Sequence, residues 1–130
     1  MSGIPVTGVN ELVLEALDLA AAEQFYGGVL GLTVVSRSEH RVWLLAGDRT
    51  RIGLWTPQVG IAQGRGGVHV HYAMHIAEAD FESALERLRS HGYEPEVLEF
   101  EETDSRAAYV TDPDGNVVEL WTFDVAGHLA

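Results

Sequence analysis

The chain has 130 residues, of which 46% are hydrophobic, a formal net charge of −12 and no cysteine. This length suits a single domain, residues 1–130, with a sizeable core. The charge argues against nucleic acid or an anionic membrane as a partner, because phosphate binding needs clustered Lys and Arg, and the missing cysteines exclude disulfides and thiolate chemistry. No apolar run is long enough to span a bilayer and the N-terminus lacks signal-peptide features, so we expect a cytoplasmic protein.

The first half of the chain predicts a strand, a helix and three further strands. Residues 6–17 are expected to form the first strand. Asp18 is a suitable N-cap for a helix that runs to about Val29, and Gly31 is expected to end this helix in a left-handed conformation. The apolar stripe at helical spacing consists of Ala22, Phe25, Tyr26 and Val29. The later strands are expected near 32–37, 40–46 and 50–56.

A glycine-rich linker at residues 58–67 separates this half from a second half with the same order of elements. A strand at 68–76 leads to a helix for which Asp80 is the expected N-cap and Gly92 the end. The run 112–115, Asp-Pro-Asp-Gly, predicts a turn, because Pro sets φ at its second position and Gly tolerates a positive φ. The buried stripe of the helix consists of Phe81, Ala84, Leu85 and Leu88. Strands are expected near 95–101, 105–111 and 116–123.

The two halves repeat each other. Residues 43–56 and 109–122 align without a gap, and both segments end in Leu-Trp-Thr. Glu119 in the second copy stands where the first copy has Gly53. A carboxylate kept in one copy and missing from the other points to a site rather than to packing. The sequence predicts an α+β domain of two βαβββ units, about 6–57 and 68–124, which form curved mixed sheets around a cleft with the helices on the outer face.

Alternation along the strands predicts which side chains face the core. One face is nearly all apolar, as in Leu12, Ile52 and Met74, and should lie under the helices. The opposite face should meet water or a cleft. Its polar and aromatic residues are Glu11, Glu15, Arg51, Trp55, His69, His71, His75, Glu119 and Trp121.

These motifs resemble those of the vicinal oxygen chelate superfamily, which groups glyoxalase I, extradiol dioxygenases, fosfomycin-resistance proteins and bleomycin-binding proteins. The resemblance covers most of residues 6–123 and is specific for the fold, whereas it says little about the reaction, because this fold hosts many functions. The matching segments are Asn10-Glu11-Leu12-Val13-Leu14, Val29-Leu30-Gly31-Leu32, His71-Tyr72-Ala73-Met74, and the run from Tyr109 to Asn116 that leads to Glu119.

The resemblance implies metal ligands on the first and last strands of each unit. By position these are Glu11, Gly53, His71 and Glu119, of which Gly53 has no side chain to offer. A set of one imidazole and two carboxylates, Glu11, His71 and Glu119, suits Zn, Ni, Co, Mn or Fe, with the other positions open to water or substrate. The simpler alternatives are a solvated glutamate on a strand and a histidine that contacts only water.

Aromatic and basic residues near the same faces are candidates for contacts with a small-molecule substrate. Trp55 and Trp121 share a face with Gly53 and Glu119, and an apolar wall with a few polar groups is typical of a ligand pocket. Aromatic residues in strands also serve packing alone. The candidate contacts are Trp43, Arg51, Trp55, His69, His75, Tyr109 and Trp121.

Two functions of different classes follow. The first is a metal-dependent enzyme of the glyoxalase or dioxygenase type, a lyase or isomerase, in which the ion binds two neighbouring oxygens of the substrate and Glu11 or Glu119 acts as general base. The alternative is a metal-free protein that binds an antibiotic or metabolite, as bleomycin-resistance proteins do, with tryptophans and negative charge attracting a cationic ligand. Fosfomycin modification is disfavoured, because residues 99–104 are acidic where a phosphonate needs basic groups.

The resemblance also implies a homodimer. In relatives of this length the cleft commonly forms between subunits, so that the ligand from the first unit of one chain meets those of the second unit of its partner. Sheet edges left open in a single chain would also need covering.

Overall fold

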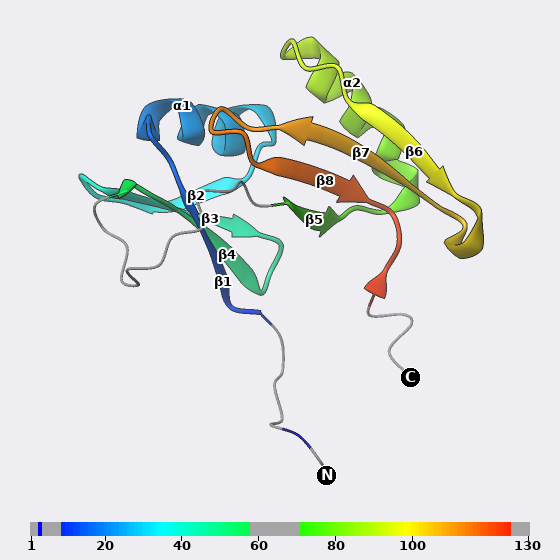
Figure 1. Ribbon diagram of the computed structural model, residues 1–130, viewed down its shortest axis with the longest axis horizontal. Helices are drawn as coiled ribbons and strands as arrows, with labels where there is room; N and C mark the ends of the chain where they lie inside the picture. The colour runs from blue at the N-terminus through cyan, green and yellow to red at the C-terminus, as the bar shows by residue number, and fades with distance from the viewer. Residues whose placement is uncertain (1–2, 4–8, 58–70, 126–130) are drawn as a thin grey trace.

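The computed structural model describes residues 3, 9–57 and 71–125, and it contains two four-stranded sheets with helical segments on one side (Figure 1). The first unit consists of β1 (Glu11–Glu15), α1 (Leu19–Glu23), the π-helix η1 (Gln24–Val29), β2 (Thr33–Arg37), β3 (Arg41–Ala46) and β4 (Thr50–Trp55). The second consists of β5 (His71–His75), the 3-10 turn η3 (Glu78–Asp80), α2 (Phe81–Ser90), β6 (Glu96–Phe100), the 3-10 turn η4 (Glu101–Thr103), β7 (Ser105–Thr111) and β8 (Val117–Trp121). The predicted α+β fold of two βαβββ units is confirmed.

The two sheets have the same topology. Their strand orders are β1-β4-β3-β2 and β5-β8-β7-β6, and in each sheet the first pair is parallel and the others are antiparallel. The register repeats as well: Trp43 pairs with Gly53 in the first sheet, and Tyr109 pairs with Glu119 in the second. The repeat seen in the sequence is therefore a repeat in space, and β1 and β5 are corresponding edge strands.

The helix of the first unit has the predicted N-cap, and it changes from an α-helix to a π-helix along its length. The Asp18 carboxylate accepts a hydrogen bond of 3.1 Å from the backbone N–H of Ala21. After Glu23 the helix continues as a π-helix to Val29, and Gly31 follows with φ of 79°. Helical spacing alone does not reveal the wider turns, because the predicted apolar stripe is buried in either form.

Asp80 is the N-cap residue of α2, as predicted, but it caps the helix without a side-chain hydrogen bond. Asp80 ends a 3-10 turn with φ of −99° and ψ of 0°, and its side chain makes no capping hydrogen bond. A capping side chain needs an extended backbone to reach the free N–H groups, which this conformation does not provide. The helix does end at Gly92, with φ of 87°, as predicted.

The strands lie close to their predicted positions, although β1 is shorter than predicted and spans Glu11–Glu15. Residues 6–8, the predicted linker 58–67 and residues 68–70 lie outside the described part of the chain. Among the described residues, no helix is long and apolar enough to cross a membrane.

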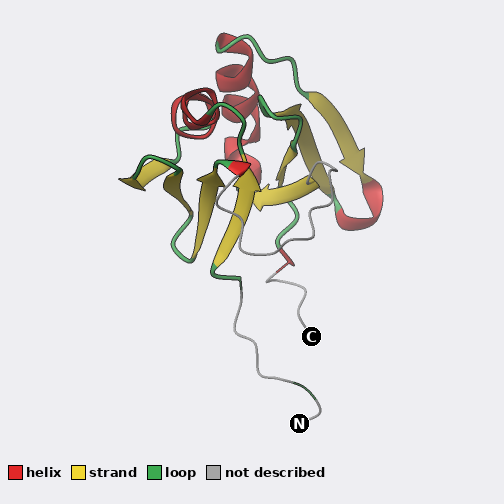
Figure 2. Cartoon of the chain, turned by 60° about the vertical axis from the view of Figure 1, so that its left-hand side comes forward, coloured by secondary structure: helices red, strands yellow, loops and turns green. Residues whose placement is uncertain are grey.

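One hydrophobic core joins the two units. Phe25, Tyr26 and Leu54 from the first unit and Phe81 and Val118 from the second are almost completely buried in the same cluster. The second view shows the helices of the two units, α1 with η1 and α2, together on one side of the two sheets (Figure 2). The opposite faces of the sheets are thus left for the polar and aromatic side chains.

A buried carboxylate at the β7–β8 turn fastens the units to each other. Asp112 accepts hydrogen bonds from the Tyr26 hydroxyl at 2.6 Å, from the Asn116 side chain at 2.9 Å, and from the backbone N–H groups of Asp114 and Asn116. Burial above all, and then Tyr72 and Asp112, raise the pKa of Tyr26 far above its ordinary value. The hydroxyl therefore keeps its proton and donates a hydrogen bond to Asp112. The predicted turn, with Gly115 at φ of 88°, is therefore also a contact between the two units.

Candidate functional site

The second sheet brings two predicted metal ligands into contact. Nε2 of His71, on edge strand β5, lies 2.9 Å from Oε1 of Glu119 on β8. The Glu119 side chain is only 8% exposed, whereas that of His71 is 58% exposed. A buried carboxylate is costly unless it is paired. Glu119 is paired with His71 and has little contact with water.

Tyr109 completes this group. It faces Glu119 across the ladder between β7 and β8, and its ring centroid lies 5.9 Å from that of His71. Burial first, and then Glu119, raise the pKa of Tyr109, so its hydroxyl keeps its proton beside the carboxylate. The group therefore combines an imidazole, a carboxylate and a protonated phenol.

The third predicted ligand does not meet the other two within one chain. Oε1 of Glu11 lies 2.8 Å from Nη2 of Arg51, on the first sheet. Residues 9–57 and 71–125 contain no group of three or more His, Cys, Asp or Glu side chains that could hold a metal ion. His71 and Glu119 are residue types that can hold a divalent ion, and no third such side chain joins them among the described residues.

The position of the missing fourth ligand is filled by tryptophan. A Cβ added to Gly53 would lie 2.6 Å from Cζ3 of Trp43 and 2.8 Å from Nε1 of Trp55, closer than real contacts allow. The two indole rings meet edge to face at 5.8 Å over this glycine. The packing of the two indole rings therefore requires glycine at this position.

Arginines cover both tryptophans. The guanidinium carbon of Arg51 lies 3.7 Å above the centre of the Trp43 ring, and that of Arg41 lies 4.5 Å above Trp55. Arg41 was not singled out from the sequence. The available signal was alternation, because Arg41 shares its face of β3 with Trp43.

Trp121 belongs to an aromatic group beside Glu119. Its ring packs against Phe100 at 6.0 Å and Phe123 at 4.9 Å, and its Nε1 donates a hydrogen bond of 3.1 Å to the Ser105 hydroxyl. Sequence reasoning missed both phenylalanines, although Phe100 lies in a predicted strand. This group forms an apolar surface two residues along β8 from the carboxylate.

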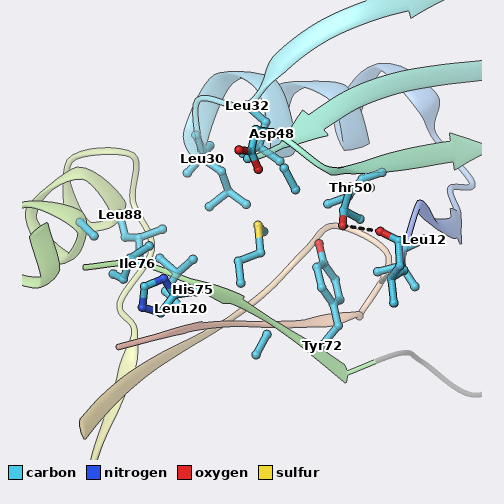
Figure 3. Close-up of a pocket in the computed structure, with 18 of the residues that line it drawn as sticks. Leu12, Leu30, Leu32, Asp48, Thr50, Tyr72, His75, Ile76, Leu88 and Leu120 are labelled. Carbon is cyan, nitrogen blue, oxygen red and sulfur yellow. Dashed lines mark hydrogen bonds between the residues drawn. The ribbon is translucent and has the colours of Figure 1, made fainter. Parts of the chain in front are cut away.

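A separate cavity of about 760 Å³ lies between the two units (Figure 3). Its apolar lining includes Leu12, Tyr72 and Met74, which are half-buried and pack against the core on the side of the helices, as strand alternation predicts. His75 is also among the residues that border this cavity, although by alternation it shares the face of His71, while His69 lies outside the described residues. By strand alternation the cavity is on the opposite face from Glu119 and Gly53.

Comparison with known proteins agrees with this architecture. Residues 8–120 match the sequence profile of the Glyoxalase/Bleomycin resistance protein/Dioxygenase superfamily, and the chain belongs to this family. It is 29% identical to glutathione transferase FosA of Serratia marcescens, over 94% of this chain and 85% of that protein. It is 26% identical to metallothiol transferase FosB of Staphylococcus haemolyticus, over 96% of this chain and 90% of that protein.

A solved relative has the same fold. The crystal structure of lactoylglutathione lyase from Agrobacterium tumefaciens superposes with a TM-score of 0.82 at 26% identity, covering 95% of this chain and 98% of that one. By their names, all three of these relatives are enzymes.

Proposed function

We propose that this chain is a metal-dependent enzyme of the glyoxalase or dioxygenase type, acting on a small substrate that offers two neighbouring oxygens to a divalent ion. The observation that carries the proposal is the contact between His71 and the buried carboxylate of Glu119. Both residues stand where the family resemblance puts metal ligands. The relatives support the proposal, since they are enzymes by name and one is called a metallothiol transferase.

The third ligand in this proposal is Glu11 of a second copy of the chain. Glu11 and His71 lie on β1 and β5, which are edge strands of their sheets. Edge strands expose unpaired backbone groups and tend to be covered, and a two-fold homodimer covers corresponding edges with each other. A partner's β1 beside β5 would bring Glu11 toward His71 and Glu119, provided that Glu11 leaves Arg51.

In this proposal the metal ion and the surrounding side chains have different roles in the reaction. His71, Glu119 and Glu11 of a second copy would hold the divalent ion, which would polarise the substrate oxygens and stabilise negative charge that develops on them. Glu119 or Glu11 takes the proton from the substrate. Tyr109 keeps its own proton and orients Glu119, and the Trp121 group excludes water from that side of the site.

A metal-free binding protein is the second candidate function, and one observation favours it. Glu11 is already paired with Arg51, and Gly53 is covered by Trp43, so two of the four family ligand positions are engaged in contacts within this chain. In this case His71 and Glu119 would form a polar group in a ligand-binding cleft.

Modification of a phosphonate remains disfavoured. Arg106, the basic residue nearest to the acidic segment 99–104, contacts Glu78 at 2.6 Å and Glu82 at 2.8 Å. These ion pairs leave it without free charge for a second anion. Transfer of a thiol to such a substrate is therefore not carried over from FosA or FosB.

Titration calorimetry with Mn, Ni, Co and Zn separates the two candidates. We expect saturable binding of at least one of these ions, with an affinity that falls on acidification, because protonation of His71 removes its lone pair. The His75→Asn variant, altered at the cavity between the units, should bind the same ion equally well. Absence of saturable binding by wild type for all four ions would support the binding protein and contradict the enzyme.

A further inference from the structure

We propose that Arg41 binds an anionic group of the ligand, in the first instance a carboxylate, and that the first sheet therefore selects an anionic ligand over a cationic one. Arg41, Trp43, Arg51 and Trp55 form what we call the Trp–Arg wall, on the open face of β3 and β4. The inference rests on the proposed function only in taking this wall as one side of the ligand site.

The tryptophan faces of the wall already hold cations. Each ring has a guanidinium stacked on it, Arg51 on Trp43 at 3.7 Å and Arg41 on Trp55 at 4.5 Å. Arginine stacks well on indole, because it is planar and weakly hydrated. A cationic ligand would have to displace one of these side chains and would be repelled by the other. The attraction of a cationic ligand inferred from the sequence therefore does not apply at this wall.

Arg41 differs from several other arginines in having no counter-ion among the described residues. Arg51 pairs with Glu11, Arg37 with Glu23 and Arg89 with Glu94. Arg41, by contrast, forms no ion pair with any described residue, and its Nε is buried without a hydrogen-bond acceptor. A carboxylate provides the paired acceptors that fit a guanidinium, so an anionic ligand would give Arg41 the counter-ion that it lacks among the described residues.

The position of Arg41 suits a ligand held at the proposed metal site. Arg41 pairs with Trp55 in the ladder between β3 and β4, and Trp43, the next residue on the same face, pairs with Gly53. Arg41 thus lies roughly 7 Å along the strand from the family's ligand position at Gly53. It is only partly exposed, and Glu15, the carboxylate paired with Trp55 in β1, is engaged in an interaction of its own. A compact ligand can therefore contact the metal ligands at one end and Arg41 at the other.

Three probes of equal size and different charge test this inference. Benzoate, benzamide and benzylammonium are titrated into the protein as purified, and binding is followed by the fluorescence of its tryptophans. We expect benzoate to bind about tenfold more tightly than benzamide, the effect of one charge-assisted contact, and benzylammonium to bind most weakly. Stronger binding of benzylammonium than of benzoate would overturn the proposal, as would the absence of saturable benzoate binding at millimolar concentration.

The variants assign the preference to Arg41. Arg41→Gln should bind benzoate and benzamide equally, Arg41→Lys should keep part of the preference through its charge, and Arg37→Gln, altered in an exposed pair with Glu23, should match wild type. Because all variants keep His71 and Glu119, a carboxylate bound to a metal contributes equally to each. An undiminished benzoate preference in Arg41→Gln would overturn the proposal.

A parallel metal titration separates this result from the proposed function. Arg41→Gln should bind metal like wild type. Loss of the anion preference with unchanged metal binding supports Arg41 as the anion contact. Failure of wild type to bind metal would contradict the enzyme while leaving the anion preference measurable.

Discussion

Replacing Glu119 by Gln should weaken the binding of a divalent metal by at least ~100-fold, because even the partners of metal ligands contribute about 10–100-fold. The amide has no charge, so its oxygen is a weaker ligand than a carboxylate oxygen, and the burial of Glu119 leaves little room for water to compensate. Calorimetric titration with the same ion and pH for both proteins measures the loss. His75→Asn is the matched control, since His75 is on the strand of His71 but borders the separate cavity. Equal losses in both variants would contradict the assignment of Glu119 as a ligand.

The Asp112→Ala variant should lose ~3–5 kcal/mol of unfolding free energy, as expected when a buried charged acceptor is removed from its donors. The change leaves the Tyr26 hydroxyl, the Asn116 side chain and two backbone N–H groups without their acceptor. Unfolding in urea, followed by circular dichroism, measures the difference.

The control for this prediction is Asp80→Ala. The Asp80 side chain makes no capping hydrogen bond, so the substitution should change the unfolding free energy by no more than ~0.5 kcal/mol. Equal losses of stability in the two variants would contradict a stabilising role for the hydrogen bonds of Asp112.

Much of the fold could be predicted from the sequence, because the relevant signals are local. Gly31 and Gly115 adopt the positive φ expected of them, and Gly92 ends its helix as predicted, also with a positive φ, since a single residue type decides such a conformation. The π-helical turns after Glu23 and the missing side-chain hydrogen bond at the N-cap residue Asp80 could not be predicted. Both depend on how a helix end packs against its surroundings, which residue spacing does not record.

Part of the candidate site could likewise be predicted from the sequence, and part could not. Strand alternation and the repeat predicted that His71 and Glu119 share a face, and they are in contact. The contacts of Gly53 and Arg41 with tryptophans could not be predicted, because they depend on the direction each ring takes across neighbouring strands. The pairing of Glu11 with Arg51 follows from the register of β1 and β4, which the sequence does not state.

The measurement that tests the central proposal most directly is metal binding by mixed chains. Glu11→Gln and His71→Ala chains are unfolded, mixed in equal amounts and refolded, and metal binding is compared with that of each variant alone. In a random two-fold dimer about one site in four receives Glu11 from one chain and His71 with Glu119 from the other. We predict that neither variant binds metal alone and that the mixture recovers about one quarter of the wild-type sites. A control mixture of His71→Ala and Glu119→Gln should recover none, because both changes lie in the second unit. No recovery in the first mixture, or full binding by Glu11→Gln alone, would contradict a metal site shared between two chains.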